Sequence, residues 1–371
     1  MTDLSDCFRP GEAWLDDRGV AINAHGPGLL FHEGTYYWFG EHKIEGRAGN
    51  SAHVGVHVYS SQDLYSWKDE GIALAVSDDP AHDLVRGCII ERPKVVYNRS
   101  TRRFVMWFHH EPKDRGYNGS RSGVAVADTP TGPFRYLGNF RPNAGVWPEN
   151  TTTEQRRELN AEEQARLAAL ELPGGPLPYY PKQILFRRDF AGGQMARDMT
   201  VFVDDDSTAY HLYSSEANGT LHISQLSDDY ERPAGKYVRV FPGGFHEAPA
   251  LMKWRGRYFL FSSGCTGWAP NAGRLSVADS IWGPWEELGN PCLGPGSLIT
   301  NTFGAQSAFV LPVAGRNDAF IFIADRWRPE NAIDGRYVWL PIQFMNDVPV
   351  IAWQDRWSLD FFDQQTFRTK L

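Results

Sequence analysis

Three acidic residues stand at the same point of a repeated pattern, where an apolar stretch begins: Glu91 in IERPKVV, Asp198 in RDMTVF and Glu247 in HEAPALM. His25 and Gln306 take this position in two further copies of the pattern. Carboxylates that meet in one pocket repel one another, and the repulsion raises the pKa of at least one of them. A carboxyl group that stays protonated near neutral pH can serve as a general acid. Glycoside hydrolysis needs such an acid, placed opposite a group that orients water.

The segments around these residues are typical of β-hairpins. Aromatic or β-branched runs such as TYYWFG, RFVMWF, AYHLYS and RYFLFS follow each opening residue, and turn sequences such as HEGT, NRSTR and DDDST precede them. A third strand follows each hairpin, often with a Trp or a Gly-Pro at its end. The polar residue is therefore expected to open the first strand of each unit.

The spacing of the five copies predicts the architecture. The intervals between His25, Glu91, Asp198, Glu247 and Gln306 are 66, 107, 49 and 59 residues. A repeat of about 50 to 60 residues with three or four strands is typical of a β-propeller. We therefore expect an all-β fold, a five-bladed β-propeller that forms a single domain over residues 1–371. Because the innermost strand of each blade runs along the central axis, the five opening residues should surround one funnel.

The long second interval predicts an insertion between blades two and three, over residues 151–182. Its charged sequence from Thr153 to Leu170 predicts one amphipathic helix, which the following PGGP would end. The charged side chains are most simply explained as a solvated face. A lid over the funnel is the alternative.

Each carboxylate also has a structural interpretation. A lone Glu or Asp at a strand start can cap a turn or pair with a neighbouring arginine, such as Arg92 beside Glu91 or Arg197 beside Asp198. Three carboxylates at one position of a repeat favour the catalytic interpretation. Metal and nucleophile motifs such as HExxH, a P-loop or GxSxG are absent from the sequence, so no metal ligands are expected.

Two loop tryptophans are candidates for sugar binding. Trp268 lies in CTGWAPN and Trp327 in DRWRPEN, and each follows a predicted strand. A loop Trp can stack on the apolar face of a sugar or can anchor the loop by packing. With the first interpretation, Asn271 and Arg326 would hydrogen-bond the sugar hydroxyls. His25, one of the opening residues, would also contact the substrate.

Composition narrows the class of protein. The net charge of −8 differs from the basic footprint of nucleic-acid binders. The sequence has no run of 18 apolar residues, so no membrane span is expected. The four cysteines lack CxxC spacing, which leaves free thiols, or a Cys265–Cys292 disulfide as the less favoured reading. The N-terminal residues lack the charged and apolar regions of a signal peptide, which favours a cytoplasmic location unless a leader has been removed.

The combined motifs resemble those of glycoside hydrolase family 43, whose members are five-bladed propellers. The resemblance covers nearly the whole chain except residues 151–182 and the extreme N-terminus. It is strongest to the exo-β-1,3-galactanase branch (galactan 1,3-β-galactosidase), through NAHGPGLLFHEGTYYWFGEHK, SSQDLYSWKDEGIAL, IERPKVVYN, RDMTVFVDDD, HEAPALMKWRGRYFLFSSGCTGWAPN and ADRWRPEN.

This resemblance implies hydrolysis with inversion and gives each opening residue a role. Glu247 matches the catalytic acid, and Asp198 matches the carboxylate that orients the acid and tunes its pKa. The family's usual base, an aspartate in the first blade, is missing from residues 23–26, where the sequence reads Asn-Ala-His-Gly. The galactanase branch shares this loss, and there Gln306 would orient the water. Glu91 matches a further essential acidic residue that would contact the substrate.

The resemblance also sets the alternatives. The expected substrate is an oligo- or polysaccharide, with β-1,3-galactan favoured over the substrates of an α-L-arabinofuranosidase or β-xylosidase of the same family. A non-catalytic carbohydrate-binding propeller is the alternative from another class. No organic cofactor is expected, and a divalent ion such as calcium in the central channel, as in relatives, has no ligand set that the sequence reveals. Protein partners cannot be read from the sequence.

Overall fold

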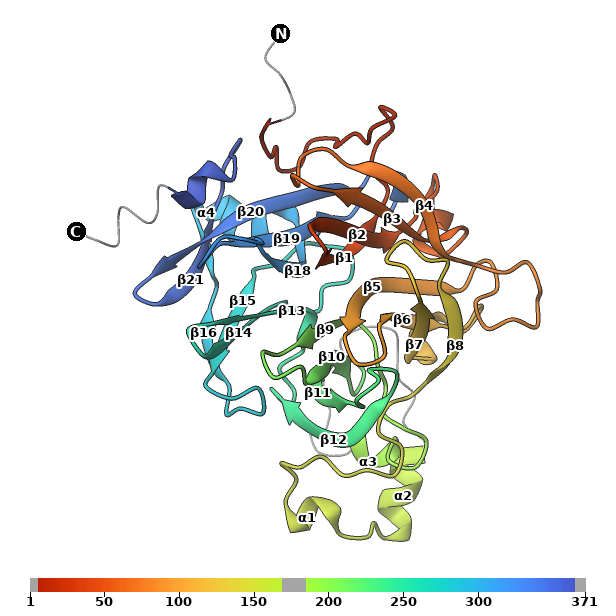
Figure 1. The fold of residues 1–371 in the computed structure, drawn as a ribbon. Helices are drawn as coiled ribbons and strands as arrows, with labels where there is room; N and C mark the ends of the chain where they lie inside the picture. The colour runs from red at the N-terminus through yellow and green to blue at the C-terminus, as the bar shows by residue number, and fades with distance from the viewer. Residues whose placement is uncertain (1–5, 169–184, 364–371) are drawn as a thin grey trace.

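The computed structural model describes residues 6–168 and 185–363, which form five blades around a central axis (Figure 1). Each blade is built on four consecutive antiparallel strands, to which the fifth blade adds one short strand. The innermost strands β1, β5, β9, β13 and β18 contact one another in a closed ring. The predicted five-bladed propeller is therefore confirmed.

The strands of the first three blades are β1 (His25–His32), β2 (Thr35–Glu41), β3 (Gly55–Ser61), β4 (Lys68–Ala75), β5 (Ile89–Asn98), β6 (Arg103–Glu111), β7 (Arg121–Ala127), β8 (Arg135–Phe140), β9 (Met199–Val203), β10 (Ala209–Ser215), β11 (Thr220–Leu226) and β12 (Pro233–Val240). Those of the last two are β13 (Glu247–Trp254), β14 (Arg257–Ser263), β15 (Arg274–Ala278), β16 (Glu286–Gly289), β18 (Gln306–Pro312), β19 (Phe320–Arg326), β20 (Arg336–Met345) and β21 (Val348–Ala352).

Local sequence explains the hairpins. The turn between β1 and β2 consists of Glu33 and Gly34, with φ of 48° and 81°. The turn between β13 and β14 consists of Arg255 and Gly256, with φ of 49° and 78°. Two successive left-handed residues give the turn whose twist matches that of the paired strands, and glycine adopts this conformation without strain.

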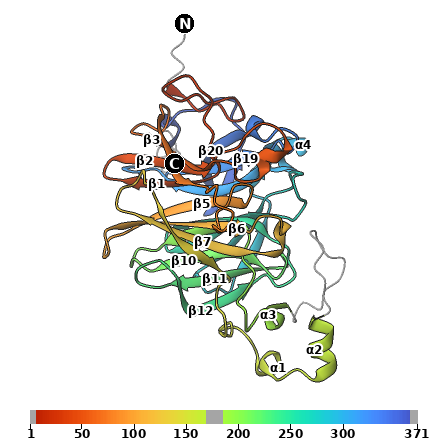
Figure 2. The same ribbon diagram turned by 90° about the vertical axis from the view of Figure 1, so that its right-hand side faces the viewer.

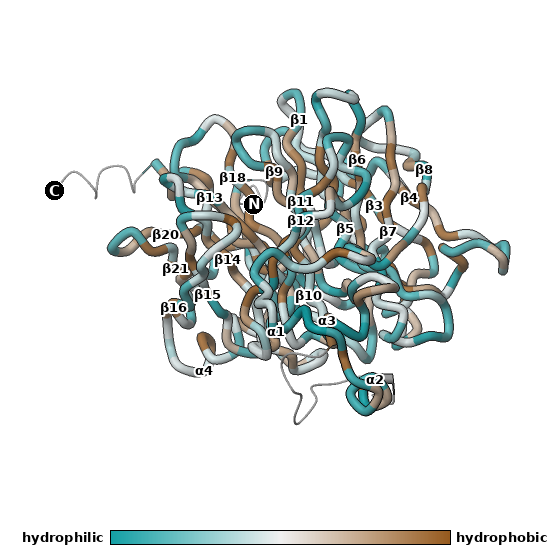
Figure 3. Tube along the Cα trace, turned by 90° about the horizontal axis from the view of Figure 1, so that it is seen from below, coloured by the Kyte–Doolittle hydropathy of each residue, from teal (hydrophilic) through white to brown (hydrophobic). Residues whose placement is uncertain are grey.

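Five hydrophobic clusters hold the blades together, one at each interface between neighbours. Hydrophobic stretches are accordingly concentrated in the strands, whereas the surrounding loops are mostly hydrophilic (Figure 3). Representative buried pairs are Phe39 and Phe108 between blades 1 and 2, Trp107 and Tyr213 between 2 and 3, Leu212 and Leu260 between 3 and 4, Phe261 and Phe322 between 4 and 5, and Trp38 and Trp339 between 5 and 1.

Residues near the two ends of the chain pack together where blades 5 and 1 meet. The backbone of Phe8 pairs with that of Trp357, with N···O distances of 2.8 and 3.2 Å, and their rings stack at 4.2 Å. Blade 5 gains a fifth strand, β17 (Cys292–Leu293), which pairs parallel to β21. In the part of the chain that the structure describes, no other sheet contains strands of two blades. Blades 5 and 1 are therefore joined by side-chain packing and by the pairing of Phe8 with Trp357.

The insertion contains α1 (Thr153–Arg156) and α2 (Ala161–Ala168), and α3 (Leu185–Arg188) follows it; the three helices lie beyond the outer strand of blade 3 (Figures 1 and 2). The prediction of one helix from Thr153 to Leu170 is wrong, because two capping boxes start two separate helices. The boxes are formed by Thr152 with Gln155 and by Asn160 with Glu163. Residues 169–184, which include the end of the predicted helix and the PGGP sequence, lie outside the described residues.

The remaining helical elements are α4 (Gly296–Ile299) and the 3₁₀ turns η2 (Arg47–Asn50), η3 (Gly116–Asn118), η4 (Thr302–Gly304) and η5 (Ala332–Asp334). Among the described residues, no helix is long and apolar enough to cross a membrane. All four cysteines are free thiols, so the less favoured Cys265–Cys292 disulfide is not formed.

Candidate active site

A β-bulge follows the opening residue in three of the five inner strands. The register with the second strand shifts directly after His25, Glu91 and Glu247. A bulge bends the strand and redirects the side chains beside it. The residues that follow are left-handed, with φ of 56°, 53° and 53° at Gly26, Arg92 and Ala248.

A carboxylate from the preceding blade accepts the backbone N–H of each left-handed residue. Asp198 is one of these carboxylates, so it supports the strand that carries Glu247 in addition to facing the funnel. Sequence reasoning missed the other two, Glu41 and Asp325, although both stand near the end of an aromatic-rich second strand. The three N···O distances are 3.0 Å for Gly26 to Asp325, 2.9 Å for Arg92 to Glu41, and 3.0 Å for Ala248 to Asp198.

One cavity of about 670 Å³ opens at this end of the channel. Six of the predicted site residues line it together: Glu91, Asp198, Glu247, Gln306, Trp268 and Trp327. The lining residues that the sequence did not single out for the site are Glu41, Arg92, His109, Tyr117, Arg197, Ala217, Asn218, Phe245, Cys265, Thr266 and Gly267.

Two carboxyl groups of the cavity favour the protonated state, Glu247 and Glu41; burial raises the pKa of Glu41 although Lys43 opposes it. Burial, together with the negative charge of Asp198, raises the pKa of Glu247 to about 8, although Arg92 acts in the opposite direction. The side-chain amide of Asn218 donates to the carboxyl group, and the thiol of Cys265 hydrogen-bonds it. Glu247 can therefore carry a proton at neutral pH.

The side chain of Asp198 lies next to Glu247 and is held by an ion pair with Arg92 and by a hydrogen bond from a backbone N–H group. Its Oδ1 is 3.0 Å from Nε of Arg92, and its Oδ2 accepts the N–H of Ala248. The residue directly precedes β9. These contacts fix an anionic group beside the carboxyl group of Glu247, which is the arrangement that raises a neighbour's pKa.

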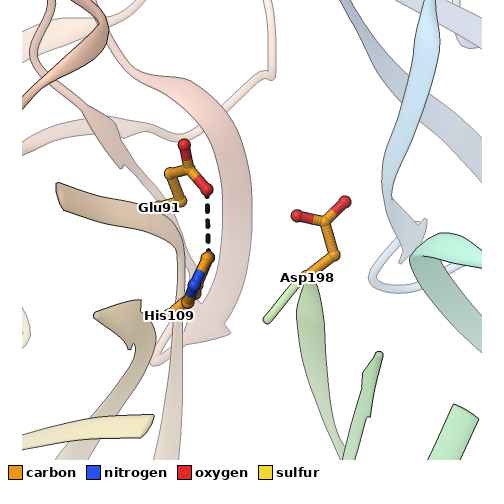
Figure 4. Close-up of side chains that lie close together, drawn as sticks. All are labelled: Glu91, His109 and Asp198. Carbon is orange, nitrogen blue, oxygen red and sulfur yellow. Dashed lines mark hydrogen bonds and ion pairs between the residues drawn. The ribbon is translucent and has the colours of Figure 1, made fainter. Parts of the chain in front are cut away.

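Glu91 has the opposite electrostatic environment. Its two oxygens accept hydrogen bonds from Nδ1 of His109 at 3.0 Å and from the hydroxyl of Tyr117 at 2.6 Å. Burial by itself would raise the pKa of Glu91, but these bonds and the charges of His109 and Lys43 outweigh it and lower the pKa to about 2. Glu91 is therefore ionised, and Figure 4 shows it bonded to His109, with Asp198 facing the pair from another strand.

His109 bridges two carboxylates and is unsuited to bind a metal. One ligand atom each of Glu91, His109 and Asp198 lies within 4.8 Å of the others. However, the second ring nitrogen of His109 donates to Glu111 at 2.9 Å. Burial alone would lower the pKa of His109, but the two carboxylates raise it to about 10. An imidazolium with both nitrogens occupied offers no lone pair to a cation.

The resemblance allows a divalent ion in the central channel, where a buried lysine lies. Lys94 is buried there, and its Nζ donates to the carbonyl oxygens of Gly26 and Arg92 at 3.1 and 3.2 Å. Burial lowers the pKa of Lys94 well below its usual value, and the two carbonyl groups belong to the inner strands of blades 1 and 2. The channel at this level thus contains an amine bound to carbonyls, and these residues do not fit a calcium site.

The amide of Gln306 is fixed by three side chains. Its Oε1 accepts from Nη2 of Arg92 at 2.7 Å and from Nε1 of Trp327 at 2.9 Å. Its Nε2 donates to Oγ of Ser263 at 3.0 Å. The Trp327 ring meets the edge of Trp268 at 5.7 Å, so the amide and the two loop tryptophans form one wall of the cavity.

Three predicted substrate contacts lie outside this cavity. The side chain of His25 is 1% exposed, and its Nδ1 lies 3.2 Å from Asp325, so its ring faces the protein interior. The side chain of Asn271 closes its own loop by bonding the backbone of Gly264. Arg326 donates to the carbonyl of Phe303. Asn271 and Arg326 line a smaller neighbouring cavity of about 320 Å³ that shares the tryptophan wall.

The fold and the cavity together define a class of protein. A propeller that gathers four carboxyl groups in a funnel, with Glu247 favouring the protonated form and Glu91 the ionised form, beside aromatic rings, has the parts that hydrolysis of a glycoside requires. None of the insertion residues that the structure describes lines the cavity, so the lid interpretation has no support among them.

Comparison with known proteins identifies the family. Residues 173–297 match the family model described as Glycosyl hydrolases family 43. The solved structure of a family 43 β-1,3-galactosidase with galactodeoxynojirimycin is 49% identical over 95% of this chain and 100% of that chain, with a TM-score of 0.88. The chain belongs to glycosyl hydrolases family 43. It is thus an enzyme that hydrolyses glycosidic bonds, and its substrate is a carbohydrate.

Further relatives carry related names. An exo-β-1,3-galactanase from Phanerochaete chrysosporium, solved with galactose, is 32% identical over 95% of this chain and 68% of that chain, with a TM-score of 0.75. An exo-β-1,3-galactanase from Clostridium thermocellum is 31% identical over 94% and 66%, with the same TM-score. A β-D-galactofuranosidase from Aspergillus niger is 26% identical over 158 residues, and the match spans less than half of that protein, 44%.

Proposed function

We propose that the protein is an exo-acting, inverting glycoside hydrolase that releases galactose from β-1,3-linked galactan. The names and the identities of the galactosidase and galactanase relatives support the substrate. The observation that carries the mechanism is the separation of two pKa values in one cavity, about 8 for Glu247 and about 2 for Glu91. Such a separation assigns one carboxyl group to proton donation and the other to a permanently ionised role.

Glu247 is the general acid. It donates its proton to the glycosidic oxygen while the bond from this oxygen to the anomeric carbon breaks. Burial, together with the charge of Asp198, keeps the pKa of Glu247 high enough for the proton to be present at neutral pH. A water on the opposite face of the sugar then attacks the anomeric carbon, so that the product has inverted configuration.

Glu91 binds the sugar. It lines the cavity as an ionised acceptor, and His109 and Tyr117 hold both of its oxygens in place. A carboxylate held this way accepts hydrogen bonds from sugar hydroxyls without moving. Trp268 and Trp327 provide the apolar faces, since 38% of Trp268 is exposed and both rings line the cavity.

A substrate panel tests this function. Purified enzyme is assayed with β-1,3-galactobiose, an aryl α-L-arabinofuranoside and an aryl β-xyloside, and NMR follows the anomer that forms first. We expect galactobiose to have the highest kcat/KM and α-galactose to appear first. Preference for the arabinofuranoside or the xyloside would overturn the galactan assignment, and β-galactose as the first product would overturn inversion.

The acid is tested by Glu247→Gln. We expect kcat on galactobiose to fall by roughly 10²–10⁴-fold, the usual contribution of a general acid. The matched control is Glu286→Gln, because Glu286 is exposed on β16 and outside the cavity. Retention of near-normal turnover in Glu247→Gln would refute the assignment. Binding of galactobiose by the wild type without turnover would instead indicate a carbohydrate-binding propeller.

A further inference from the structure

The contacts of Gln306 determine which end of its amide faces the substrate. Arginine and the tryptophan ring nitrogen are hydrogen-bond donors only. The amide atom that contacts both Arg92 and Trp327 must therefore be the carbonyl oxygen, and the atom on Ser263 must be the nitrogen. A carbonyl oxygen has two lone pairs, and both are occupied here. The second N–H of Nε2 is left for the cavity.

We propose that Gln306 acts on the attacking water as a hydrogen-bond donor through this N–H, and that Arg92 and Trp327 are positioning residues that keep its carbonyl oxygen from accepting the water's proton. The inference rests on the proposed inverting hydrolysis. A water that accepts from Nε2 uses one lone pair for this bond and directs the other at the anomeric carbon.

The same contacts disfavour the imidic tautomer of Gln306 as a base. In that tautomer the carbonyl oxygen becomes a hydroxyl group, and its hydrogen would need an acceptor. The neighbours of this oxygen, Arg92 and Trp327, both point N–H groups at it. A hydroxyl that also stays an acceptor for two donors has no direction left for its own hydrogen, so the amide form is retained.

In this mechanism no protein side chain needs to accept the proton of the attacking water. The bond from the anomeric carbon to the leaving oxygen breaks as Glu247 protonates this oxygen, and a bond from the water oxygen to the anomeric carbon forms. The water's surplus proton passes to solvent water in the cavity, and Glu247 takes a proton from solvent before the next turnover. Because the transition state resembles an oxocarbenium ion, the reaction depends more on the position of the water than on its prior deprotonation.

Arg92 connects this water to the acid. Its Nη2 holds the carbonyl oxygen of Gln306, its Nε pairs with Asp198, and its Nη1 donates to the carbonyl of Ser307 at 2.9 Å. The side chain is buried, and its left-handed backbone follows directly after Glu91. One guanidinium group therefore sets both the carboxylate that tunes Glu247 and the amide that aims the water.

The variant Gln306→Glu separates a donor from a base. One oxygen of the new carboxyl takes the place of Oε1 between Arg92 and Trp327, and the other takes the place of Nε2. When ionised it can accept but cannot donate, so we expect kcat at pH 7 to be at least tenfold below wild type. The ratio of variant to wild-type kcat should rise as the pH is lowered, because the protonated carboxyl donates again. The ratio is compared between about pH 4.5 and 7, where Glu247, with a pKa of about 8 that an added negative charge raises further, stays mostly protonated in both enzymes.

The opposite result identifies a base. Variant kcat within tenfold of wild type at pH 7, or a ratio that rises with increasing pH, would overturn the inference. The assay uses whichever glycoside the wild type cleaves with the highest kcat/KM. A wrong galactan assignment would appear in the wild-type panel alone, whereas a wrong role for Gln306 appears only in the variant's ratio.

A second pair of variants decides the matter if Gln306→Glu does not fold. Trp327→Phe keeps an aromatic ring on the wall but removes the N–H that holds Gln306. Trp268→Phe is the matched control, because Trp268 lies on the same wall and its ring contacts Trp327. We expect both to raise KM, and Trp327→Phe alone to lower kcat further, by about fivefold. Equal effects on kcat at matched unfolding temperatures would overturn the positioning role.

Discussion

The variant Asp198→Asn is expected to move the alkaline limb of the pH–rate profile toward lower pH. Burial and the negative charge of Asp198 together raise the pKa of Glu247 to about 8, and Arg92 opposes them. Asparagine keeps the size and an acceptor oxygen for the N–H of Ala248, but it removes the charge and leaves Arg92 without its partner. Both changes favour ionised Glu247, so the direction of the shift is unambiguous.

The magnitude follows from the strength of one neighbouring charge. A single close charge shifts a pKa by one to three units, and a drop of about 1.5 units corresponds to about 2 kcal/mol. Glu247 would then have a pKa of about 6.5 instead of about 8. At pH 7 the protonated fraction would fall from about 90% to about 25%, and so kcat/KM would fall about fourfold from protonation alone.

The assay is kcat/KM against pH from 5 to 9.5, which reports the free enzyme's ionisations. Asp128→Asn is the control, because Asp128 is exposed and lies outside the cavity. An alkaline limb that stays in place, or that moves upward, would refute the account of Glu247 given above. A uniform loss of activity at every pH would mean that Asp198 acts by orienting the acid rather than by its charge.

Three further predictions concern stability and binding. The folded protein holds Glu247 protonated up to a pKa of about 8, so the wild type loses stability as the pH rises from about 4.5 through 8. Glu247→Gln should therefore unfold at a higher temperature than wild type at pH 9 and at the same temperature at pH 4. Tyr117→Phe removes one hydrogen bond to Glu91 and should raise KM several-fold while kcat changes less than twofold. Phe8→Ala deletes a ring that is 1% exposed and stacks on Trp357, and should lower the free energy of unfolding by about 3–5 kcal/mol in denaturant titrations.

Each of these has a result that contradicts it. An unfolding temperature of Glu247→Gln that does not separate from wild type between pH 4 and 9 would mean that the folded state does not hold the proton. A Tyr117→Phe effect confined to kcat would move Tyr117 from binding to chemistry. A loss below about 1 kcal/mol in Phe8→Ala would show that the terminal pairing does not close the ring.

Much of the fold was predictable because its information is local. Alternating apolar runs and turn residues such as Glu33–Gly34 specify hairpins within a few positions of the chain. The opening residues could be found because they recur at one place in the repeat, and four of them, Glu91, Asp198, Glu247 and Gln306, do line one cavity. The insertion does not form the single predicted helix, because the capping box of Asn160 with Glu163 starts a second helix within it.

The sequence by itself determined the number of blades, the strands that form them and the types of side chain at the end of the funnel. The tertiary structure decided which side chains meet, because hydrogen bonds and ion pairs join residues far apart in the chain. Arg92 of blade 2 contacts Asp198 of blade 3 and Gln306 of blade 5. His25 turns inward to Asp325 instead of lining the cavity. The pKa of Glu247 depends on the burial of its carboxyl group and on the charges of Asp198 and Arg92. Its protonation at neutral pH is therefore a property of the folded protein only.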